Sequence, residues 1–203
     1  MKFTKRDFYF CLATGLITGF STWRIFNFLK IPVFFGVPHV WLMVIVPFLW
    51  IIGVNFGYFL GQRLNFFNQF GRFAAIGFTN AAVDFVILNL LIAGTGIASG
   101  IYYSVFKTIS FICAVIPSYF WNKYWAFKSG GQGGVGVMEF SKFFSVMIVS
   151  ILINNGVASF VVNYIHPLLG FNPQRWANVG GIVGSAAALI FSFIGFKLAV
   201  FRK

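Results

Sequence analysis

Residues 118–130, SYFWNKYWAFKSG, end a long apolar run with an Asn-Lys pair set among aromatic side chains and then pass into glycine. Residues 192–203, SFIGFKLAVFRK, end the chain in a similar way. Aromatic and basic side chains gather where a membrane helix reaches the lipid headgroups. The two stretches therefore predict that the apolar runs before them are transmembrane helices.

The composition favours the same fold class. Hydrophobic residues make up 59% of the 203 positions and charged residues 9%, which is too little charge for the polar surface of a water-soluble protein. The formal net charge of +12 would suggest a nucleic-acid partner in a soluble chain. Here most of the basic residues lie between apolar runs of about 20 residues, the length that spans a bilayer. We therefore expect an all-α integral membrane protein with no nucleic-acid partner.

Six apolar runs are expected to cross the membrane as three hairpins. They cover roughly residues 8–28, 39–62, 73–94, 101–122, 143–165 and 178–200. With a cytoplasmic amino terminus, eleven of the fifteen Lys and Arg residues lie on the inner side, as the positive-inside rule requires. The sequence thus predicts a multi-pass protein of the cytoplasmic membrane with both termini in the cytoplasm.

The last two predicted hairpins resemble each other. Lys197 follows Lys123 by 74 positions, within the two similar endings quoted above. Arg72 in FGRF and Lys142 in FSKF are 70 positions apart, at the beginnings of the two hairpins. Each copy holds two spans, so both copies enter and leave on the same side of the membrane. The pattern predicts a parallel internal repeat.

Polar residues interrupt two of the predicted spans. Asp84 lies near the middle of the third span, where an ionised carboxylate needs a partner. Lys107, in the next span, is the expected partner by depth, and Asn80 lies one turn before Asp84 on the same helix face. An ion pair that fixes two helices and a polar lining along a transport path both stay open. Asn154 and Asn155, at similar depth in the fifth span, are expected to form interhelical hydrogen bonds.

The sequence offers little material for catalysis. Its acids are Asp7, Asp84 and Glu139, and its cysteines, Cys11 and Cys113, each lie inside an apolar run. No nucleophile-base-acid set and no metal cluster can be assembled from these residues. We therefore expect a protein that is not an enzyme and uses no cofactor or metal ion.

Residues from about 70 to 203 resemble the GtrA-like membrane protein family. RFAAIGFTNAAVDFVILNLL resembles the first helix of that family, with its Asn and Asp, and SYFWNKYWAFK resembles its signature second-helix ending. The resemblance implies a four-helix transmembrane domain over residues 67–203, with residues 1–66 as an accessory amino-terminal hairpin. Three roles stay open for that hairpin, namely dimerisation with a second copy, docking of a partner and closure of the bundle.

The resemblance also implies a function. Members of the family are implicated in moving polyprenyl-phosphate-linked sugars across the cytoplasmic membrane for cell-surface polysaccharide or teichoic-acid glycosylation. By this analogy the candidate functional residues are Asn80, Asp84, Lys107, Asn122, Lys123 and Trp125. The second copy departs from the family pattern, because Phe196 stands where the family commonly has an Asn before the Lys.

Basic residues at the predicted cytoplasmic mouth complete the candidate substrate site. They are Arg72, Lys123, Lys142 and Lys197. Their charges could capture the phosphate of a lipid-linked sugar, and they could equally bind ordinary anionic headgroups. The expected partners are thus a polyprenyl-phosphate-linked sugar, membrane lipids and a membrane glycosyltransferase.

Two other functions stay open. The protein could be a non-transporting membrane anchor or regulatory subunit of a polyprenyl-phosphate glycosyltransferase. It could also be a small ion-coupled transporter that uses Asp84 as a proton site.

Overall fold

The computed structural model describes residues 2–33, 36–65, 67–126 and 137–195, and every regular element among them is a helix. The long helices are α1 (Lys5–Phe28), α2 (Leu42–Leu60), α3 (Phe67–Thr95), α4 (Gly100–Trp121), α5 (Val137–Tyr164) and α6 (Pro173–Gly195). A short 3-10 helix, η1 (His39–Trp41), leads into α2, and a π-helical turn, η2 (Asn122–Ala126), continues α4. The all-α prediction is confirmed for these residues.

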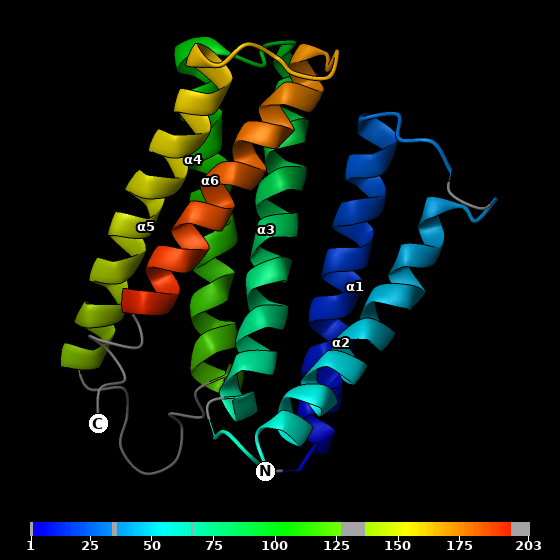
Figure 1. Ribbon diagram of the computed structural model, residues 1–203, viewed down its shortest axis with the longest axis vertical. Coiled ribbons are helices and arrows are strands. Elements are labelled where there is room, and N and C mark those ends of the chain that lie inside the picture. Colours follow the sequence, from blue (N-terminus) through cyan, green and yellow to red (C-terminus); the bar gives the residue numbers. More distant parts are fainter. Residues whose placement is uncertain (1, 34–35, 66, 127–136, 196–203) are drawn as a thin grey trace. The chain divides into compact units, whose positions relative to one another are not determined.

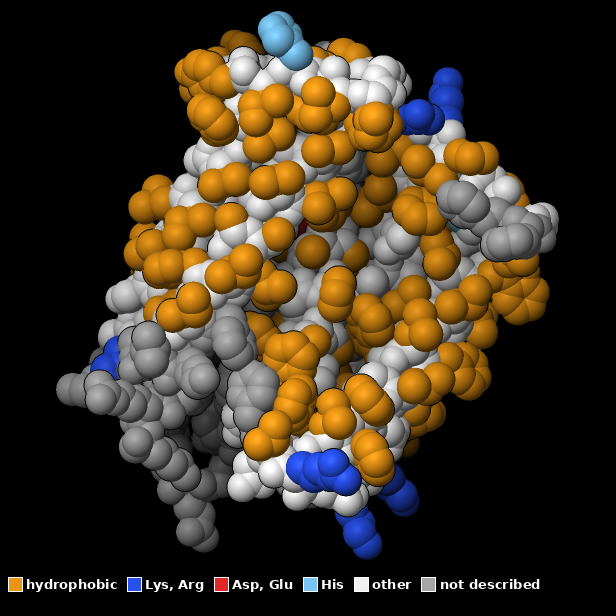
Figure 2. All heavy atoms as spheres, in the orientation of Figure 1, with side chains coloured by type: hydrophobic (Ala, Val, Ile, Leu, Met, Phe, Trp, Pro, Cys, Tyr) orange, Lys and Arg blue, Asp and Glu red, His pale blue; other side chains and the backbone are white. Residues whose placement is uncertain are grey.

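Four helical segments of the described chain are long and apolar enough to cross a membrane. They are His39–Leu60, Phe67–Thr95, Gly100–Ser118 and Ser141–Tyr164. Figure 2 shows hydrophobic side chains over most of the visible face, which is the surface that contact with lipid chains requires. The chain is thus a multi-pass membrane protein, while the six crossings, the three hairpins and the internal repeat stay predictions.

The chain divides into two compact units. The first unit comprises residues 1–86 and 116–131, and the second unit comprises residues 87–115 and 132–203. The division passes through α3 and α4, so both helices contribute to both units. The predicted domain boundary after residue 66 stays a prediction.

In the first unit, glycines bring helix backbones close together. The helices α1 and α2 run antiparallel side by side (Figure 1), and a Cβ atom on Gly15 would lie 2.5 Å from Cα of Pro47. A Cβ atom on Gly57 of α2 would likewise lie 3.2 Å from Cα of Gly71 in α3. Such small residues let membrane helices approach where larger side chains would separate them. The hairpin of α1 and α2 therefore packs directly on the beginning of α3.

The core of the first unit also includes the π-helical turn. Its buried members are Cys11, Val54, Tyr58, Ala75, Ile76, Trp125 and Ala126. They come from α1, α2, α3 and η2. The signature stretch at the end of α4 is thus packed against the amino-terminal hairpin.

In the second unit, α5 and α6 form an antiparallel pair (Figure 1) with the same use of small residues. A Cβ atom on Gly184 would lie 2.9 Å from Cβ of Ala158. Eight positions along each helix from this contact, the hydroxyl groups of Ser150 and Ser192 are 2.7 Å apart. The contact between these helices is therefore made by small side chains and neutral hydrogen bonds.

The two asparagines of α5 form the interhelical hydrogen bonds expected from the sequence. Asn154 Nδ2 donates to Ser185 Oγ of α6 at 3.2 Å, and Asn155 Nδ2 donates to Thr108 Oγ1 of α4 at 2.8 Å. This prediction is confirmed. A further pair was not foreseen, because Asn89 and Asn178 exchange two hydrogen bonds of 2.7 Å between α3 and α6.

Candidate functional site

The signature stretch NKYWA forms the π-helical turn η2 at the end of α4. A π-helical turn holds one residue more than an α-helical turn and is frequent at functional sites. Here the turn presents Asn122 and Trp125 to the first unit as buried side chains, with exposed fractions of 5% and 1%. Both belonged to the candidate site predicted from the sequence.

Asn122 is joined to α3 through a serine. The side-chain amide of Asn80 donates to Ser118 Oγ at 2.6 Å, and the amide of Asn122 donates to the same oxygen at 3.1 Å. Asn122 Nδ2 also donates to the backbone carbonyl of Ser118 at 2.9 Å. Its other polar atom, Oδ1, is buried and has no hydrogen-bond partner among the described residues. This group therefore has an unused acceptor inside the protein.

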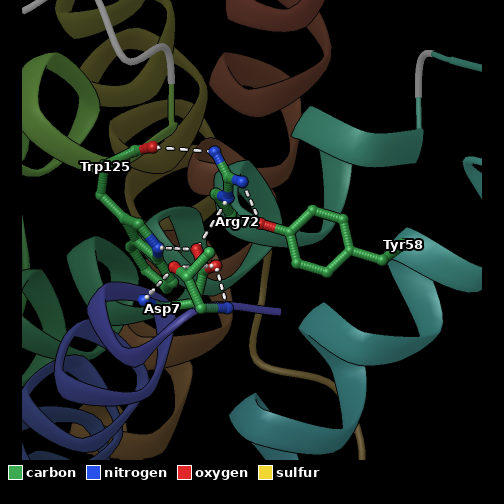
Figure 3. A network of polar contacts seen from close by, with 5 residues as sticks. Asp7, Tyr58, Arg72 and Trp125 are labelled. Atoms are coloured by element: carbon green, nitrogen blue, oxygen red, sulfur yellow. Dashed lines mark hydrogen bonds and ion pairs between the residues drawn. The ribbon is translucent and has the colours of Figure 1, made fainter. Parts of the chain in front are cut away.

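Arg72, in α3, lies at the centre of a second group (Figure 3). Its side chain is 2% exposed, and its Nε atom is 3.1 Å from Oδ1 of Asp7 in α1. Nη1 donates to the backbone carbonyl of Trp125 at 3.1 Å, and Nη2 donates to the hydroxyl of Tyr58 in α2. Nη1 and Nη2 thus have hydrogen-bond partners from two parts of the first unit, while Nε is at ion-pair distance from Asp7 but makes no hydrogen bond among the described residues.

The carboxylate of Asp7 is held from several sides. Oδ2 accepts hydrogen bonds from the backbone N–H and the hydroxyl of Thr4, at 2.9 and 2.7 Å, within a capping box that begins α1. Oδ1 accepts from Trp125 Nε1 at 3.0 Å. The ring of Phe10 stacks on Trp125 with centroids 5.3 Å apart. These contacts join α1 to the signature turn.

The electrostatic balance at Asp7 favours the charged form. Burial raises the pKa of this carboxyl, but the hydrogen bonds from Thr4 and Trp125 and the charge of Arg72 outweigh burial, and the pKa lies below its ordinary value. Asp7 is in the first turn of α1, ahead of the apolar residues that follow it. The carboxylate and the guanidinium therefore form a buried ion pair at neutral pH.

Sequence reasoning missed this ion pair. Arg72 was expected as a cation at the cytoplasmic mouth, and Asp7, Tyr58 and Thr4 were not among the candidates. One signal was present, because Thr4 and Asp7 have the spacing of a capping box before an apolar run. That motif predicts where α1 begins, but it does not identify a partner 65 positions away.

The remaining predicted residues are distributed over both units. Asp84, in α3, and Lys107, in α4, are buried, with exposed fractions of 2% and 0%, and their pairing stays a prediction. Lys142, near the beginning of α5, is exposed. Lys197 and the side chain of Lys123 lie outside the described residues. The predicted meeting of four cations at one mouth therefore stays a prediction.

The two groups around Asn122 and Arg72 offer hydrogen-bonding groups for a ligand. Within the described residues, no group of three His, Cys, Asp or Glu side chains lies close enough to hold a metal ion. The amide oxygen of Asn122 can accept a hydrogen bond from a hydroxyl group, and Arg72 with Trp125 can donate hydrogen bonds to an anion.

Comparison with known proteins identifies a family. Residues 72–201 match the model of the GtrA/DPMS transmembrane domain family. No curated protein and no solved structure matches the chain. The match begins at Arg72 and covers the signature turn, so that Asp7 and Tyr58 lie ahead of the matched region.

Proposed function

Because the chain belongs to the GtrA/DPMS transmembrane domain family, which is associated with flipping of lipid-linked sugars, we propose that it moves a polyprenyl-phosphate-linked sugar across the cytoplasmic membrane. The translocated sugar would serve cell-surface polysaccharide synthesis or glycosylation. The apolar tail of such a substrate can remain in lipid. The sugar, however, must pass the hydrocarbon region, so the protein has to supply hydrogen-bonding groups.

The unused acceptor of Asn122 carries this proposal. A buried amide oxygen without a partner costs free energy in a folded protein, and that cost is removed when a ligand donates a hydrogen bond to it. Sugar hydroxyl groups are such donors. Asn80 and Asn122 share Ser118, so a hydroxyl that binds at Asn122 joins a polar chain leading into α3. Both asparagines lie within the matched family region.

The other candidate residues have roles in the same proposal. Asp84 and Lys107 would offer hydrogen bonds to sugar hydroxyl groups deeper in the membrane. Lys123, Lys142 and Lys197 would attract the lipid phosphate from the cytoplasmic side, where cations bind anionic headgroups.

Proteoliposomes that contain a labelled polyprenyl-phosphate hexose in one leaflet test the proposal. The wild-type protein should move label to the opposite leaflet. Asn122→Ala should slow this movement about fivefold, the equivalent of one hydrogen bond of about 1 kcal/mol. Asn55→Ala is the matched control, because Asn55 is exposed on α2 and its side chain donates only to the backbone of its own helix, at Ile51.

Failure of the wild-type protein to move label would overturn the transport proposal. Co-purification with a membrane glycosyltransferase would then support the anchor or regulatory subunit. Uptake of a soluble solute driven by a pH gradient would instead support an ion-coupled transporter.

The proposed capture of the lipid phosphate by Lys123 can be tested by comparing two alanine variants. Lys123→Ala and Lys128→Ala each remove one positive charge from the same signature ending, but only Lys123 is next to Asn122, and Lys128 lies five positions farther along the chain. We expect Lys123→Ala to slow transport more than Lys128→Ala. Equal rates for the two variants would show that Lys123 contributes no more than general attraction of anions.

The predicted orientation can be tested by labelling. A Gly133→Cys variant, in a chain whose Cys11 and Cys113 are replaced by serine, should react with an impermeant thiol reagent only after cells are permeabilised. Labelling of intact cells would contradict the predicted cytoplasmic position of residue 133.

A further inference from the structure

We propose that Arg72 and Trp125 form an oxyanion site for the phosphate of a polyprenyl lipid, and that Asp7 occupies this site when no lipid phosphate is bound. The inference rests on the proposed function only for the identity of the lipid. The site itself is inferred from the geometry of the first unit.

Two donors converge on one oxygen. Arg72 Nε lies 3.1 Å from Asp7 Oδ1, and Trp125 Nε1 donates to the same atom at 3.0 Å. The other carboxylate oxygen, Oδ2, is held by Thr4 of its own helix end. The oxygen therefore accepts a hydrogen bond from Trp125 and lies at ion-pair distance from Arg72, whose buried Nε makes no hydrogen bond among the described residues. One phosphate oxygen in its place could accept hydrogen bonds from both donors.

The donors are held in place by contacts other than Asp7. Arg72 Nη1 donates to the backbone carbonyl of Trp125 at 3.1 Å, and Nη2 donates to the hydroxyl of Tyr58. The guanidinium also lies over the Tyr58 ring, 5.1 Å from its centroid. These contacts keep Nε directed toward the anion, so the site remains formed when Asp7 leaves it.

The charge of the site determines the class of its ligand. Arg72 is 1% exposed, and a buried guanidinium without an anion is strongly destabilising. A neutral sugar cannot replace the carboxylate, whereas a phosphate monoester or diester can. Arginine is a frequent ligand for phosphate because its planar N–H groups match the phosphate oxygens.

Asp7 then acts as an intramolecular competitor. Only the fraction of molecules with an open site binds lipid phosphate, so occupation by Asp7 weakens the apparent affinity. Removing the Asp7 charge should strengthen binding. A purely structural role of Asp7 predicts equal or weaker binding instead, because loss of the charge would disorder the site.

Full-length protein in nanodiscs of neutral lipid allows the test. The probe is a fluorescent polyprenyl monophosphate, with the matching polyprenol as a ligand that lacks the phosphate. Asp7→Asn should bind the phosphate probe about tenfold more tightly than wild type, while polyprenol binding is unchanged. Gln62→Lys is the control, because it also raises the net charge by one, at an exposed position of the first unit, and it should leave the affinity unchanged. Equal or weaker binding by Asp7→Asn would overturn the proposal.

A second variant covers the case in which Asp7→Asn does not fold. Thr4→Val keeps the carboxylate but removes the hydroxyl that donates to it. Asp7 should then leave the site more easily, and the phosphate probe should bind about twofold more tightly. Inorganic phosphate, compared with chloride at equal ionic strength, should also raise the melting temperature of Thr4→Val more than that of wild type. An equal shift for both proteins would contradict an exchangeable site.

Competition in the same nanodiscs shows whether the site prefers the phosphate of a polyprenyl lipid or that of an ordinary phospholipid. Phosphatidylglycerol at the same mole fraction should displace little of the polyprenyl monophosphate probe. Full displacement would keep the anion site and overturn its assignment to polyprenyl lipids.

Transport measured on the same proteins separates the two proposals. If wild type moves no labelled sugar but Asp7→Asn gains affinity for the phosphate probe, the transport function fails and the site stands. If wild type transports and Asp7→Asn gains no affinity, the site fails and the transport function stands.

Discussion

The first unit and the second unit both bring helices together through small residues, but the first unit adds a buried ion pair. At the beginning of α1, one acid and one base are buried together and connect α1, α2, α3 and η2. Between α5 and α6, glycines and hydroxyl groups make contacts without formal charge. The close contacts between α5 and α6 depend on the shapes of the two helices, so no other group can replace them. The buried guanidinium of Arg72, in contrast, can pair with any anion that reaches it. Exchange of one anion for another is therefore expected in the first unit.

Removal of Arg72 should have the largest effect. Arg72→Leu leaves the Asp7 carboxylate buried without a cation, and we expect a loss of about 3–5 kcal/mol in the free energy of unfolding. Denaturant unfolding of the purified protein in detergent micelles measures it. Combining the change with Asp7→Leu should cost less than the sum of the two single changes, and strict additivity would contradict the ion pair.

Overfilling the α5–α6 contact should have the next largest effect. A Cβ atom at position 184 would lie 2.9 Å from Cβ of Ala158, so Gly184→Val should destabilise the protein by about 1–3 kcal/mol. Gly156→Val is the matched control on α5, because a Cβ atom there meets no atom within 4 Å. Similar losses for both variants would show that helix propensity, and not close contact, limits the site.

Acid should distinguish the two means of holding helices. The pKa of Asp7 is lowered in the folded protein, so its contribution is fully present above the unfolded pKa of about 3.9 and is lost as the pH falls through the folded pKa. Melting temperatures from pH 7 to pH 3 should fall less steeply for Asp7→Asn than for wild type. Gly184→Val should keep the wild-type slope. Only part of the stability that Asp7 contributes is lost between pH 7 and pH 3, so this loss of stability is smaller than the loss caused by Arg72→Leu.

The smallest effect is expected at the hydroxyl pair of the second unit. Ser150→Ala removes the 2.7 Å contact with Ser192, and neutral hydrogen bonds between membrane helices contribute about 0.6 kcal/mol on average. Ser145→Ala is the control, because Ser145 is exposed and donates only to the backbone of Ser141 in its own helix. Thermal unfolding that separates these two variants by more than 2 kcal/mol would place this contact in the same class as the ion pair.

The positions of the helices were largely predictable, because an apolar run of sufficient length is a local property of the sequence. The predicted span 101–122 corresponds to α4 (Gly100–Trp121), and 8–28 corresponds to α1 (Lys5–Phe28). The beginning of α3 was less predictable. It starts at Phe67 and not near residue 73, because the polar side chains of Asn68 and Arg72 are buried in the first unit instead of lying in a loop.

The candidate site was predictable only in part. Asn122 and Trp125 were identified from the signature ending, and both are buried in the turn that this ending forms. The contact of Arg72 with Asp7 depends on the way α1 packs on α3, and no periodicity in either segment encodes it. The unused oxygen of Asn122 could not be foreseen either, because it depends on which side chains pack around it in the folded protein.

The ion pair of Arg72 and Asp7 also has a consequence for how this sequence can diverge. Arg72 is the first residue of the matched family region, and Asp7 lies ahead of it, so only one residue of the pair belongs to that region. A relative that carries α1 and α2 but loses the acid at position 7 must also neutralise position 72 or obtain an anion elsewhere. The two positions should therefore covary among relatives that carry the amino-terminal hairpin. Position 58 should drift more freely, because many polar side chains can accept one hydrogen bond from a guanidinium.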